Sequence, residues 1–316
     1  MKKVLIPGTD LAVSNICYGA AYCGLEDEQR YFECLDCFAE NGGNFIDTAN
    51  IYGKWLPHKM NSNEMMLGKW MHGKKNRGDI VLASKAAHPE LAAMDVPRMS
   101  RREITSDLEE SLSALQTDYL DVFWLHRDAE NIPVGEIMEI LFEIHNSGKA
   151  KYFGCSNWKP ERIAKALEYA GKKGKKGFVA SQPQWSLAVP NKSAADDKTA
   201  YRMDAEGIRL HGRTGLAAVP YSSQAGGFFA KLNSGSASEG LLARYKNDEN
   251  MRIYENMKEL SRQTGYSCTQ ISLGYLMSHD FVAIPIIGSK NPAQITDSVS
   301  ASEIRLGKQE MELLLG

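Results

Sequence analysis

Eight short apolar segments recur along this chain of 316 residues, and a stretch with helical periodicity follows each of them. Such an alternation predicts parallel strands joined by helical crossovers. Eight strand–helix units are the number that closes a (β/α)8, or TIM, barrel, so the sequence predicts an α/β barrel fold. The predicted strands span residues 16–19, 44–47, 80–85, 120–126, 152–156, 178–182, 216–221 and 282–286.

The other common α/β fold, an open doubly wound sheet, would place a Gly-x-Gly-x-x-Gly motif after the first strand. Residues 19–24 instead read Gly-Ala-Ala-Tyr-Cys-Gly, which has the wrong spacing. A short β-hairpin is predicted before the barrel, within residues 4–13, and additional helices are predicted near the C-terminus. Ser100 and Glu103 have the spacing of a capping box at the start of one barrel helix. Because no linker or repeat divides the sequence, residues 1–316 are expected to form one barrel domain.

Charge and composition argue against several classes of protein. The net charge is −2 and no long basic stripe is present, which argues against binding to nucleic acids or membrane surfaces. The basic cluster at residues 172–176 lies between a predicted helix and a predicted strand and is interpreted as a solvated turn. Pro7 and Gly8 stop the apolar run near the N-terminus, and no segment reaches membrane-spanning length, so neither a signal peptide nor a membrane span is predicted. The six cysteines are scattered, and Cys34 and Cys37 fall inside a helical pattern, which predicts reduced thiols in a cytoplasmic protein.

Three predicted strands each end on an ionisable residue, namely Asp47, Lys85 and His126. Tyr52 lies in the loop after the first of these strands. The C-terminal ends of barrel strands meet at one face, where catalytic groups gather. Taken singly, Asp47 could cap a helix, Tyr52 could be a packing residue, and His126 could be a hydrogen-bonded core histidine. Together the four residues predict a catalytic site.

The residue types of this set suit the reduction of a carbonyl, which needs a hydride at carbon and a proton at oxygen. A free tyrosine has a pKa near 10. A lysine ammonium beside Tyr52 would lower that pKa, and Lys85 fits this role. Asp47 would keep Lys85 charged and oriented. His126 would hydrogen-bond the substrate oxygen and polarise it.

These residues and their order make the chain resemble the aldo-keto reductase superfamily over its whole length. The resemblance is closer to the bacterial branch with short C-termini and to potassium-channel β subunits than to the steroid-reducing branch. It implies an NAD(P)H-dependent oxidoreductase that interconverts aldehydes, ketones or sugar-derived carbonyls with alcohols, with Tyr52 as general acid and base. The matching segments are residues 45–53, 84–85, 118–126, 154–157 and 286–290, together with Gln182.

The resemblance also implies that the nicotinamide cofactor lies across the barrel mouth. By this likeness Ser156, Asn157 and Gln182 would hydrogen-bond the carboxamide. Tyr221 would stack on the nicotinamide ring, and Ser222 would begin the pyrophosphate loop. This loop departs from the Pro-Leu pair and the glycine order common in related sequences, so the register of its contacts stays open.

By the same likeness, Ser289, Lys290 and Gln294 would meet the adenosine end of the cofactor at the start of a helix, where anions are favoured. Lys290 would pair with a 2′-phosphate, whereas Asp297 could accept a hydrogen bond from a free ribose hydroxyl. Lys290 could also be an ordinary surface lysine. The expected cofactor is NADPH, with NADH as the open alternative, and no metal site is predicted.

Four aromatic residues follow predicted strand ends: Tyr22, Trp55, Trp158 and Trp185. They could form an aromatic wall for a small-molecule carbonyl substrate, or they could be plain packing residues. By the same resemblance, the steroid-reducing branch has a long C-terminal loop that is not expected here, which favours small aldehydes, ketones or sugar-derived carbonyls over steroids. A nicotinamide-binding regulatory subunit with little turnover is the main alternative function. A barrel hydrolase or isomerase would leave the lysine and the tyrosine unexplained, and monomer and homo-oligomer both stay open.

Overall fold

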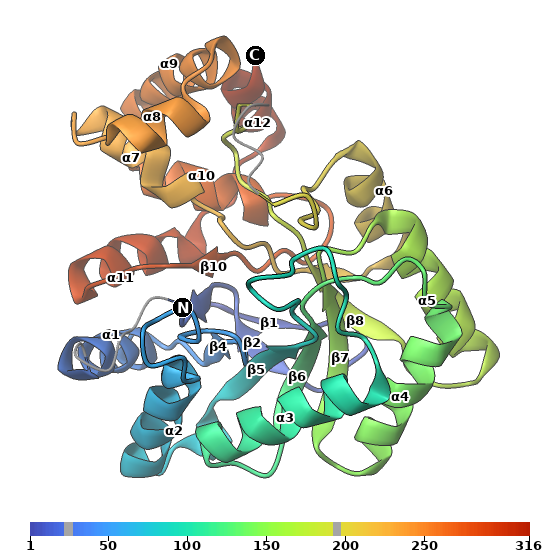
Figure 1. Cartoon of the computed structure of the whole chain (residues 1–316). Coiled ribbons are helices and arrows are strands. Elements are labelled where there is room, and N and C mark those ends of the chain that lie inside the picture. Colours follow the sequence, from blue (N-terminus) through green and yellow to red (C-terminus); the bar gives the residue numbers. More distant parts are fainter. Residues whose placement is uncertain (22–27, 192–196) are drawn as a thin grey trace.

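The computed structural model describes residues 1–21, 28–191 and 197–316. Eight parallel strands form one sheet in the order β10–β3–β4–β5–β6–β7–β8–β9 (Figure 1). The strands are β3 (Cys17–Gly19), β4 (Phe45–Asp47), β5 (Val81–Ala86), β6 (Leu120–Leu125), β7 (Ala150–Ser156), β8 (Phe178–Gln182), β9 (Ala217–Ala218) and β10 (Ile286–Ile287).

The two ends of this sheet meet, so the sheet closes into a barrel. β10 pairs with β3 at one end. At the other end a parallel bridge joins Ala218 in β9 to Ala283, and the backbone N–H of Ile286 donates to Pro220 O at 2.9 Å. Closure satisfies backbone groups that an open sheet would leave at its edges. The predicted (β/α)8 barrel is therefore confirmed.

Strands β9 and β10 are shorter than the segments predicted for them, 216–221 and 282–286. Pro220 and Pro285 fall within these segments, and a proline has no N–H to donate to its neighbour. Both prolines still accept hydrogen bonds, as where the N–H of Cys17 donates to Pro285 O at 3.0 Å. The prolines thus shorten the regular ladder without opening the barrel.

The predicted N-terminal hairpin is present as β1 (Lys3–Leu5) paired antiparallel with β2 (Ala12–Ser14). Its residues Ile6 and Val13 are buried in one cluster with Phe45, which begins β4. The hairpin therefore closes the end of the barrel opposite to the strand C-termini.

Strand β6 shows how the two-residue period of a strand divides the core. Val122 and Trp124 belong to the cluster inside the barrel. Phe123 and Leu125 belong to the cluster between the strands and the surrounding helices. Continuing the same period directs residue 126 toward the interior at the barrel mouth.

Helices cover the outside of the barrel and continue beyond it. One helix of the set α1–α6 follows each strand from β3 to β8, α7–α10 lie between β9 and β10, and α11 and α12 follow β10. In Figure 1, α7, α8, α9 and α12 form a group that stands apart from the barrel.

Among the described residues, no helix is both long and apolar enough to span a bilayer. The helices are α1 (Glu28–Glu40), α2 (Ser62–Lys74), α3 (Arg101–Leu115), α4 (Val134–Asn146), α5 (Pro160–Lys172), α6 (Ala205–Thr214), α7 (Phe228–Asn233), α8 (Glu239–Tyr245), α9 (Asp248–Thr264), α10 (Cys268–Met277), α11 (Pro292–Val299) and α12 (Lys308–Leu315), with short 3₁₀ turns at Arg77–Asp79, Ala225–Gly227 and Ser300–Glu303.

Helix α3 begins with the predicted capping box. The Ser100 side chain accepts from the backbone N–H of Glu103, and the Glu103 carboxylate accepts from the Ser100 N–H at 3.0 Å. Such a cap stabilises a helix by about 1 kcal/mol. The helix then buries Ile104, Leu108 and Leu112 on one face, which packs it against the barrel.

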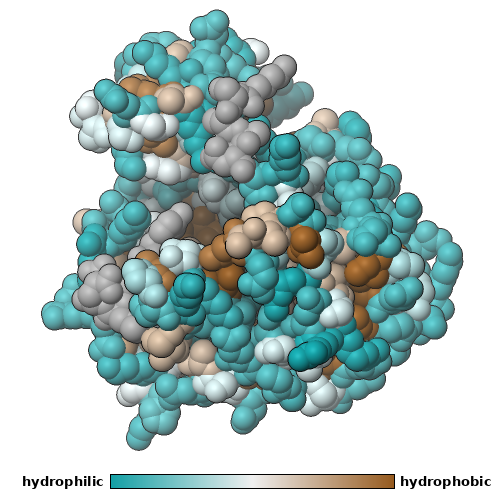
Figure 2. Space-filling model, viewed as in Figure 1, coloured by the Kyte–Doolittle hydropathy of each residue, from teal (hydrophilic) through white to brown (hydrophobic). Residues whose placement is uncertain are grey.

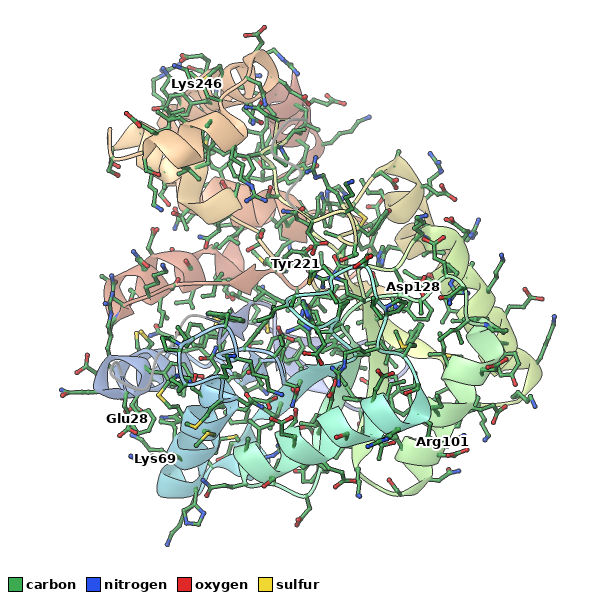
Figure 3. All side chains as sticks on the ribbon, viewed as in Figure 1. Glu28, Lys69, Arg101, Asp128, Tyr221 and Lys246 are labelled. Atoms are coloured by element: carbon green, nitrogen blue, oxygen red, sulfur yellow. The ribbon has the colours of Figure 1, made fainter. Side chains whose placement is uncertain are left out.

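The C-terminal face of the barrel is hollowed. Figure 2 shows this hollow between the barrel and the group of α7, α8, α9 and α12. Figure 3 places Tyr221 at the centre of this region, and it places Glu28 and Lys69 at the periphery. There, Glu28 and Lys69 form an ion pair of 2.7 Å that links α1 to α2.

We predict that Gly154→Ala destabilises the barrel. A Cβ at Gly154 in β7 would overlap the indole of Trp124 and lie 2.9 Å from Ala180 O, so neighbouring strands would have to separate. Overpacking of this kind costs about 1–3 kcal/mol, measured as a lower free energy of unfolding in urea. Gly171→Ala in α5 is the matched control, because its Cβ would meet nothing within 4 Å. Equal stabilities of the two variants would contradict the tight packing at β7.

Candidate active site

The four predicted catalytic residues lie together at the barrel mouth, and a buried ammonium connects three of them. Lys85 Nζ donates to Asp47 Oδ2 at 2.5 Å, to Thr48 O at 2.6 Å and to the Tyr52 hydroxyl at 3.3 Å. The same nitrogen lies 4.8 Å from the centroid of the Tyr52 ring. The ring centroids of Tyr52 and His126 are 5.9 Å apart. The structure thus forms a chain of carboxylate, ammonium and phenol with an imidazole beside it.

The register of the sheet explains this convergence. Asp47 is the last residue of β4 and pairs with Ala83 in β5. Ala83 faces the barrel interior, and Lys85 follows it by two residues, so its side chain points the same way. His126 follows Trp124 by two residues in the same manner, and its backbone N–H donates to Ala86 O at 2.8 Å.

The ammonium of Lys85 stays charged although it is 1% exposed. Burial by itself lowers the pKa of Lys85, but Asp47 and Tyr52 act against burial and hold this pKa above its ordinary value. Gln182 Nε2 donates to Asp47 Oδ1 at 3.1 Å. The second carboxylate oxygen is therefore also satisfied, and the ion pair is fixed in orientation.

The expectation that Tyr52 ionises below its free value is wrong in this structure. Burial raises the pKa of Tyr52, and Asp47 adds to the rise, while the ammonium of Lys85 opposes it without overcoming it. The phenol is therefore protonated at neutral pH. A protonated phenol beside an ammonium can donate its proton and leave a phenolate that the ammonium stabilises.

His126 is neutral at neutral pH. Burial lowers the pKa of His126 well below its ordinary value, and the positive charge of Arg127 and of Lys85 lowers it further. His88 lies 4.7 Å away, ring centroid to ring centroid, and burial together with Arg127 lowers the pKa of His88 to about 4. Within the described part of the chain, His126 Nδ1 is buried without a hydrogen-bond partner. An imidazole in this state can donate one hydrogen bond to a neighbouring oxygen.

The residues expected at the nicotinamide end form a second hydrogen-bonded group next to His126. Asn157 follows β7 in the left-handed conformation (φ 62°). Its Nδ2 donates to His126 O at 3.2 Å, and its Oδ1 accepts from the Tyr221 hydroxyl at 2.8 Å. Ser156 Oγ donates to Gln182 O at 2.9 Å. The backbone conformation of Asn157 thus directs a buried amide to the mouth of the barrel.

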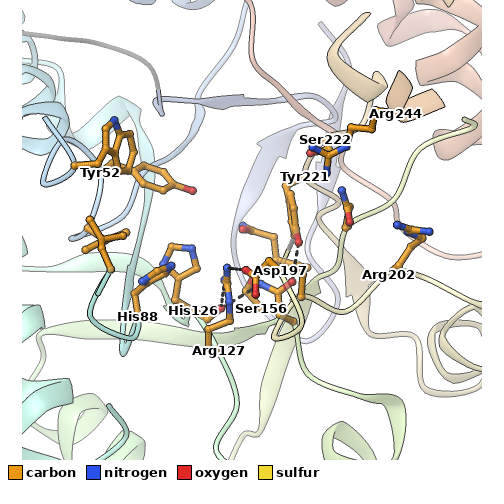
Figure 4. Close-up of a pocket in the computed structure, with 17 residues that line it drawn as sticks. Tyr52, His88, His126, Arg127, Ser156, Asp197, Arg202, Tyr221, Ser222 and Arg244 are labelled. Carbon is orange, nitrogen blue, oxygen red and sulfur yellow. Dashed lines mark hydrogen bonds and ion pairs between the residues drawn. The ribbon is translucent and has the colours of Figure 1, made fainter. Parts of the chain in front are cut away.

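These groups border one cavity of about 500 Å³ at the barrel mouth (Figure 4). Asp47 and Lys85 lie beneath its lining. Eight of the predicted site residues line it: Tyr52, Trp55, His126, Ser156, Asn157, Gln182, Tyr221 and Ser222. The other residues of the lining are Ile51, His88, Leu91, Arg127, Gln184, Asp197, Ala200, Arg202 and Arg244.

Sequence reasoning missed the charged part of this lining. Arg127 Nη2 lies 2.7 Å from Asp197 Oδ2, and Arg127 Nε donates to Thr199 Oγ1 at 2.8 Å. Arg127 could have been found, because it directly follows a strand that ends on a predicted catalytic residue. Asp197 and Arg202 belong to the long loop after β8, and no local pattern in that loop indicates where they lie.

The residues expected at the adenosine end lie outside this cavity but close to one another at the start of α11. Gln294 Oε1 accepts from the backbone N–H of Lys290 at 2.8 Å, and Ser289 Oγ donates to Gln294 O at 3.2 Å. Asp297, the alternative ribose partner, accepts from Ser267 Oγ at 3.4 Å. The structure therefore brings Ser289, Lys290 and Gln294 together, apart from the nicotinamide group.

The four aromatic residues expected around the substrate are divided by the fold. Trp55 lines the cavity, is 48% exposed, and contacts Tyr52 edge to face at 5.8 Å between ring centroids. Trp158 and Trp185 do not line the cavity. Trp158 is buried against Phe178, and Trp185 is buried in a separate cluster, so both occupy the packing role that the sequence left open. Tyr22 lies outside the described residues.

A buried phenol–ammonium–carboxylate chain at the mouth of a (β/α)8 barrel defines a class of barrel oxidoreductases. The family model of the aldo/keto reductase family matches residues 15–315, and the chain belongs to this family. It is therefore an NAD(P)H-dependent oxidoreductase.

Three relatives show the breadth of this family. The chain is 30% identical to the uncharacterized oxidoreductase YrpG of Bacillus subtilis (strain 168), over 99% of this chain and 95% of that protein. It is 26% identical to an aryl-alcohol dehydrogenase [NADP(+)] of Phanerodontia chrysosporium, over 99% of this chain and 84% of that protein. It is also 26% identical to a probable voltage-gated potassium channel subunit beta of Oryza sativa subsp. japonica, over 93% of this chain and 89% of that protein.

We predict that Lys85→Met raises the pKa of Tyr52. The substitution removes the group that lowers this pKa most and leaves the Asp47 carboxylate, which raises it. The measurement is the alkaline titration of the Tyr52 Cζ resonance in protein carrying ¹³C-tyrosine, assigned with Tyr52→Phe. Lys54→Met is the matched control, since Lys54 pairs with Glu110 at 2.8 Å rather than with the phenol.

Circular dichroism must show that both variants are folded, because Lys85→Met leaves a buried carboxylate without its cation. If the Tyr52 midpoint were the same in folded wild type and folded Lys85→Met, the ammonium would not act on the phenol.

Proposed function

We propose that the protein reduces aldehydes, ketones or sugar-derived carbonyls to alcohols with NADPH, and catalyses the reverse reaction, with Tyr52 as general acid and base. The observation that carries this proposal is the hydrogen bond between a charged, buried Lys85 and a protonated Tyr52 that borders the cavity. A proton donor and the cation that stabilises its conjugate base are thus already in contact.

The roles of the side chains follow from their charges. When bound, the nicotinamide supplies the hydride that the carbonyl carbon accepts. Tyr52 gives its proton to the carbonyl oxygen, and Lys85 stabilises the phenolate that remains. Asp47 holds Lys85 charged, and Gln182 holds Asp47 in place. Neutral His126 donates a hydrogen bond to the same oxygen and polarises the carbonyl.

The residues of the cavity fit a nicotinamide carboxamide, which has one acceptor and two donors. Asn157 and Gln182 carry amides, and Ser156 carries a hydroxyl, all at the cavity wall. In the structure, Asn157 Oδ1 already accepts from the Tyr221 hydroxyl and from the backbone N–H of Tyr201 at 3.1 Å. A carboxamide bound at Asn157 would therefore compete with Tyr221 for this oxygen.

NADPH is proposed over NADH because Lys290 lies at the start of α11 with Ser289 and Gln294. Among these side chains it carries the charge that a 2′-phosphate requires. The cofactor named for the aryl-alcohol dehydrogenase relative, NADP(+), supports the same choice.

A second candidate function is suggested by the relative that is a probable potassium channel subunit beta. A regulatory subunit of this fold would keep the same site and bind its nicotinamide tightly with little turnover. Consumption of NADPH by purified protein against a panel of aldehydes and ketones decides between the two functions. Retained cofactor without measurable turnover would favour the regulatory one.

Tyr52→Phe is predicted to lose most carbonyl reduction while keeping cofactor affinity. The variant removes only the proton donor, and general acid catalysis contributes about 100- to 10,000-fold. The measurement is kcat for NADPH-dependent reduction together with the Kd for NADPH. Tyr169→Phe, which removes a hydroxyl bonded to Glu139 outside the cavity lining, is the control. Reduction by Tyr52→Phe at a rate close to wild type would remove Tyr52 from the mechanism.

Lys290→Ala is predicted to weaken NADPH binding selectively. A lost charge-assisted hydrogen bond costs about 1.5–3 kcal/mol. NADH cannot lose this bond, because it has no 2′-phosphate. Titrations of both cofactors by fluorescence quenching measure the difference, with Lys258→Ala on α9 as the control, since Lys258 pairs with Glu255 at 2.6 Å. Equal losses for the two cofactors would mean that Lys290 does not contact the phosphate.

A further inference from the structure

The two ends of the cavity differ in chemistry. Tyr52, Trp55 and Leu91 come from the loops after β4 and β5 and form an apolar end, where Trp55 is 48% and Leu91 46% exposed. Arg202 and Arg244 belong to the other end, and Figure 4 shows Arg202 on the side of the cavity opposite to Tyr52. A substrate that fills this cavity would contact an apolar surface at one end and an arginine at the other.

The backbone of Arg202 is held firmly in the cavity wall. The N–H of Gln184 donates to Tyr201 O at 2.9 Å, and the N–H of Met203 donates to Gln184 O at 2.9 Å. These bonds make a parallel bridge between Arg202 and Gln184, and a second bridge joins Gln184 to Tyr221. The backbone position of Arg202 is therefore fixed, and Gln184 connects it to Tyr221 of the nicotinamide group.

The positive charge of Arg202 is not neutralised by the described parts of the chain. Arg127, the neighbouring arginine of the lining, is paired with Asp197 at 2.7 Å. The acid nearest to Arg202 in sequence is Asp204, and its Oδ1 accepts from the Tyr201 hydroxyl and from the backbone N–H of Gly207, both at 2.8 Å. Asp204 thus caps α6, and within residues 1–21, 28–191 and 197–316 no carboxylate lies at ion-pair distance from Arg202.

Cofactor phosphates could also use a cation in this region, but the connection expected to bind them carries its own arginine. The proposed pyrophosphate loop begins at Ser222, and Arg244 comes from α8 in the same connection between β9 and β10. Arg202 comes from the loop before α6, on the far side of Gln184. The guanidinium of Arg202 is a planar donor that suits a carboxylate.

We propose that Arg202 binds a carboxylate of the substrate, so that the preferred substrates are carbonyl compounds that also carry an acid group, with their apolar part against Trp55 and Leu91. This inference rests on the proposed carbonyl reduction. It makes Arg202 a determinant of specificity, which acts on substrate affinity and not on the chemical step.

The test compares a charged aldehyde with a neutral one of similar shape, 4-formylbenzoate and its methyl ester. Arg202→Met is expected to raise KM for 4-formylbenzoate about tenfold or more, the range of a lost charge-assisted hydrogen bond. It is expected to leave kcat for both aldehydes and KM for the ester within about twofold, and Arg202→Lys is expected to recover part of the loss. Arg209→Met, an exposed arginine of α6 outside the cavity lining, is the matched control.

A binding measurement separates this inference from the proposed function. Terephthalate, a dicarboxylate without an aldehyde, is titrated calorimetrically into the NADPH-saturated protein and is expected to bind wild type about tenfold more tightly than Arg202→Met. If wild type reduced neither aldehyde, the proposed carbonyl reduction would be in error, while this titration would still decide the role of Arg202.

Three outcomes would overturn the inference. Equal effects of Arg202→Met on KM for the acid and for the ester would mean that Arg202 shapes the cavity without distinguishing a charged substrate from a neutral one. A matching loss of NADPH affinity, measured by fluorescence, would assign Arg202 to the cofactor. Terephthalate binding that is the same in wild type and Arg202→Met would exclude a carboxylate site.

Discussion

The arrangement at the barrel mouth depends on one buried cation. An ammonium removed from water costs several kcal/mol unless its hydrogen-bonding capacity is filled. Lys85 fills it with the Asp47 carboxylate, a backbone carbonyl at Thr48 and the Tyr52 hydroxyl, all from β4 and the loop that follows. A shift of β4 against β5 by one residue would leave this charge unpaired. The ion pair therefore fixes the register of the two strands as well as the position of the phenol, and Gln182 extends the constraint across the barrel to β8.

The positive charges of Lys85 and Arg127 also affect the protonation states of Tyr52 and His126. Lys85 and Arg127 help to keep His126 neutral, because a second or third cation in a buried space is unfavourable. Burial keeps Tyr52 protonated, while Lys85 stabilises its phenolate form. In the proposed mechanism the tyrosine is therefore the group that transfers a proton, and the histidine is restricted to donating a hydrogen bond. Neither role follows from one side chain alone, since both depend on the positive charge of Lys85.

The sequence predicts well what is set by local periodicity. A strand alternates its side chains with period two, so an ionisable residue at the end of an apolar strand can be assigned to the mouth of a barrel, as Asp47, Lys85 and His126 were. The capping box at Ser100 is equally local. Trp158 shows the limit of this reasoning. It follows a strand end as closely as the proposed catalytic residues do, yet its indole donates to Arg127 O at 3.0 Å and packs on Phe178, because the chain has already left the strand and its direction is decided by tertiary contacts.

The charged wall of the cavity could not be predicted for the same physical reason. Asp197 and Arg202 lie in a loop whose path is set by the bridge of Arg202 to Gln184 and by the pairing of Asp197 with Arg127, two partners that lie far away in the sequence. The strand ends that carry the proposed catalytic residues belong to the rigid barrel, whereas the loops that supply this wall can change without disturbing it. Relatives of about equal identity accordingly carry names as different as an aryl-alcohol dehydrogenase and a channel subunit. The identity of the substrate is therefore to be sought in the loops after β4, β5 and β8, since in the proposed mechanism the phenol, the ammonium and the imidazole suit any carbonyl that these loops admit.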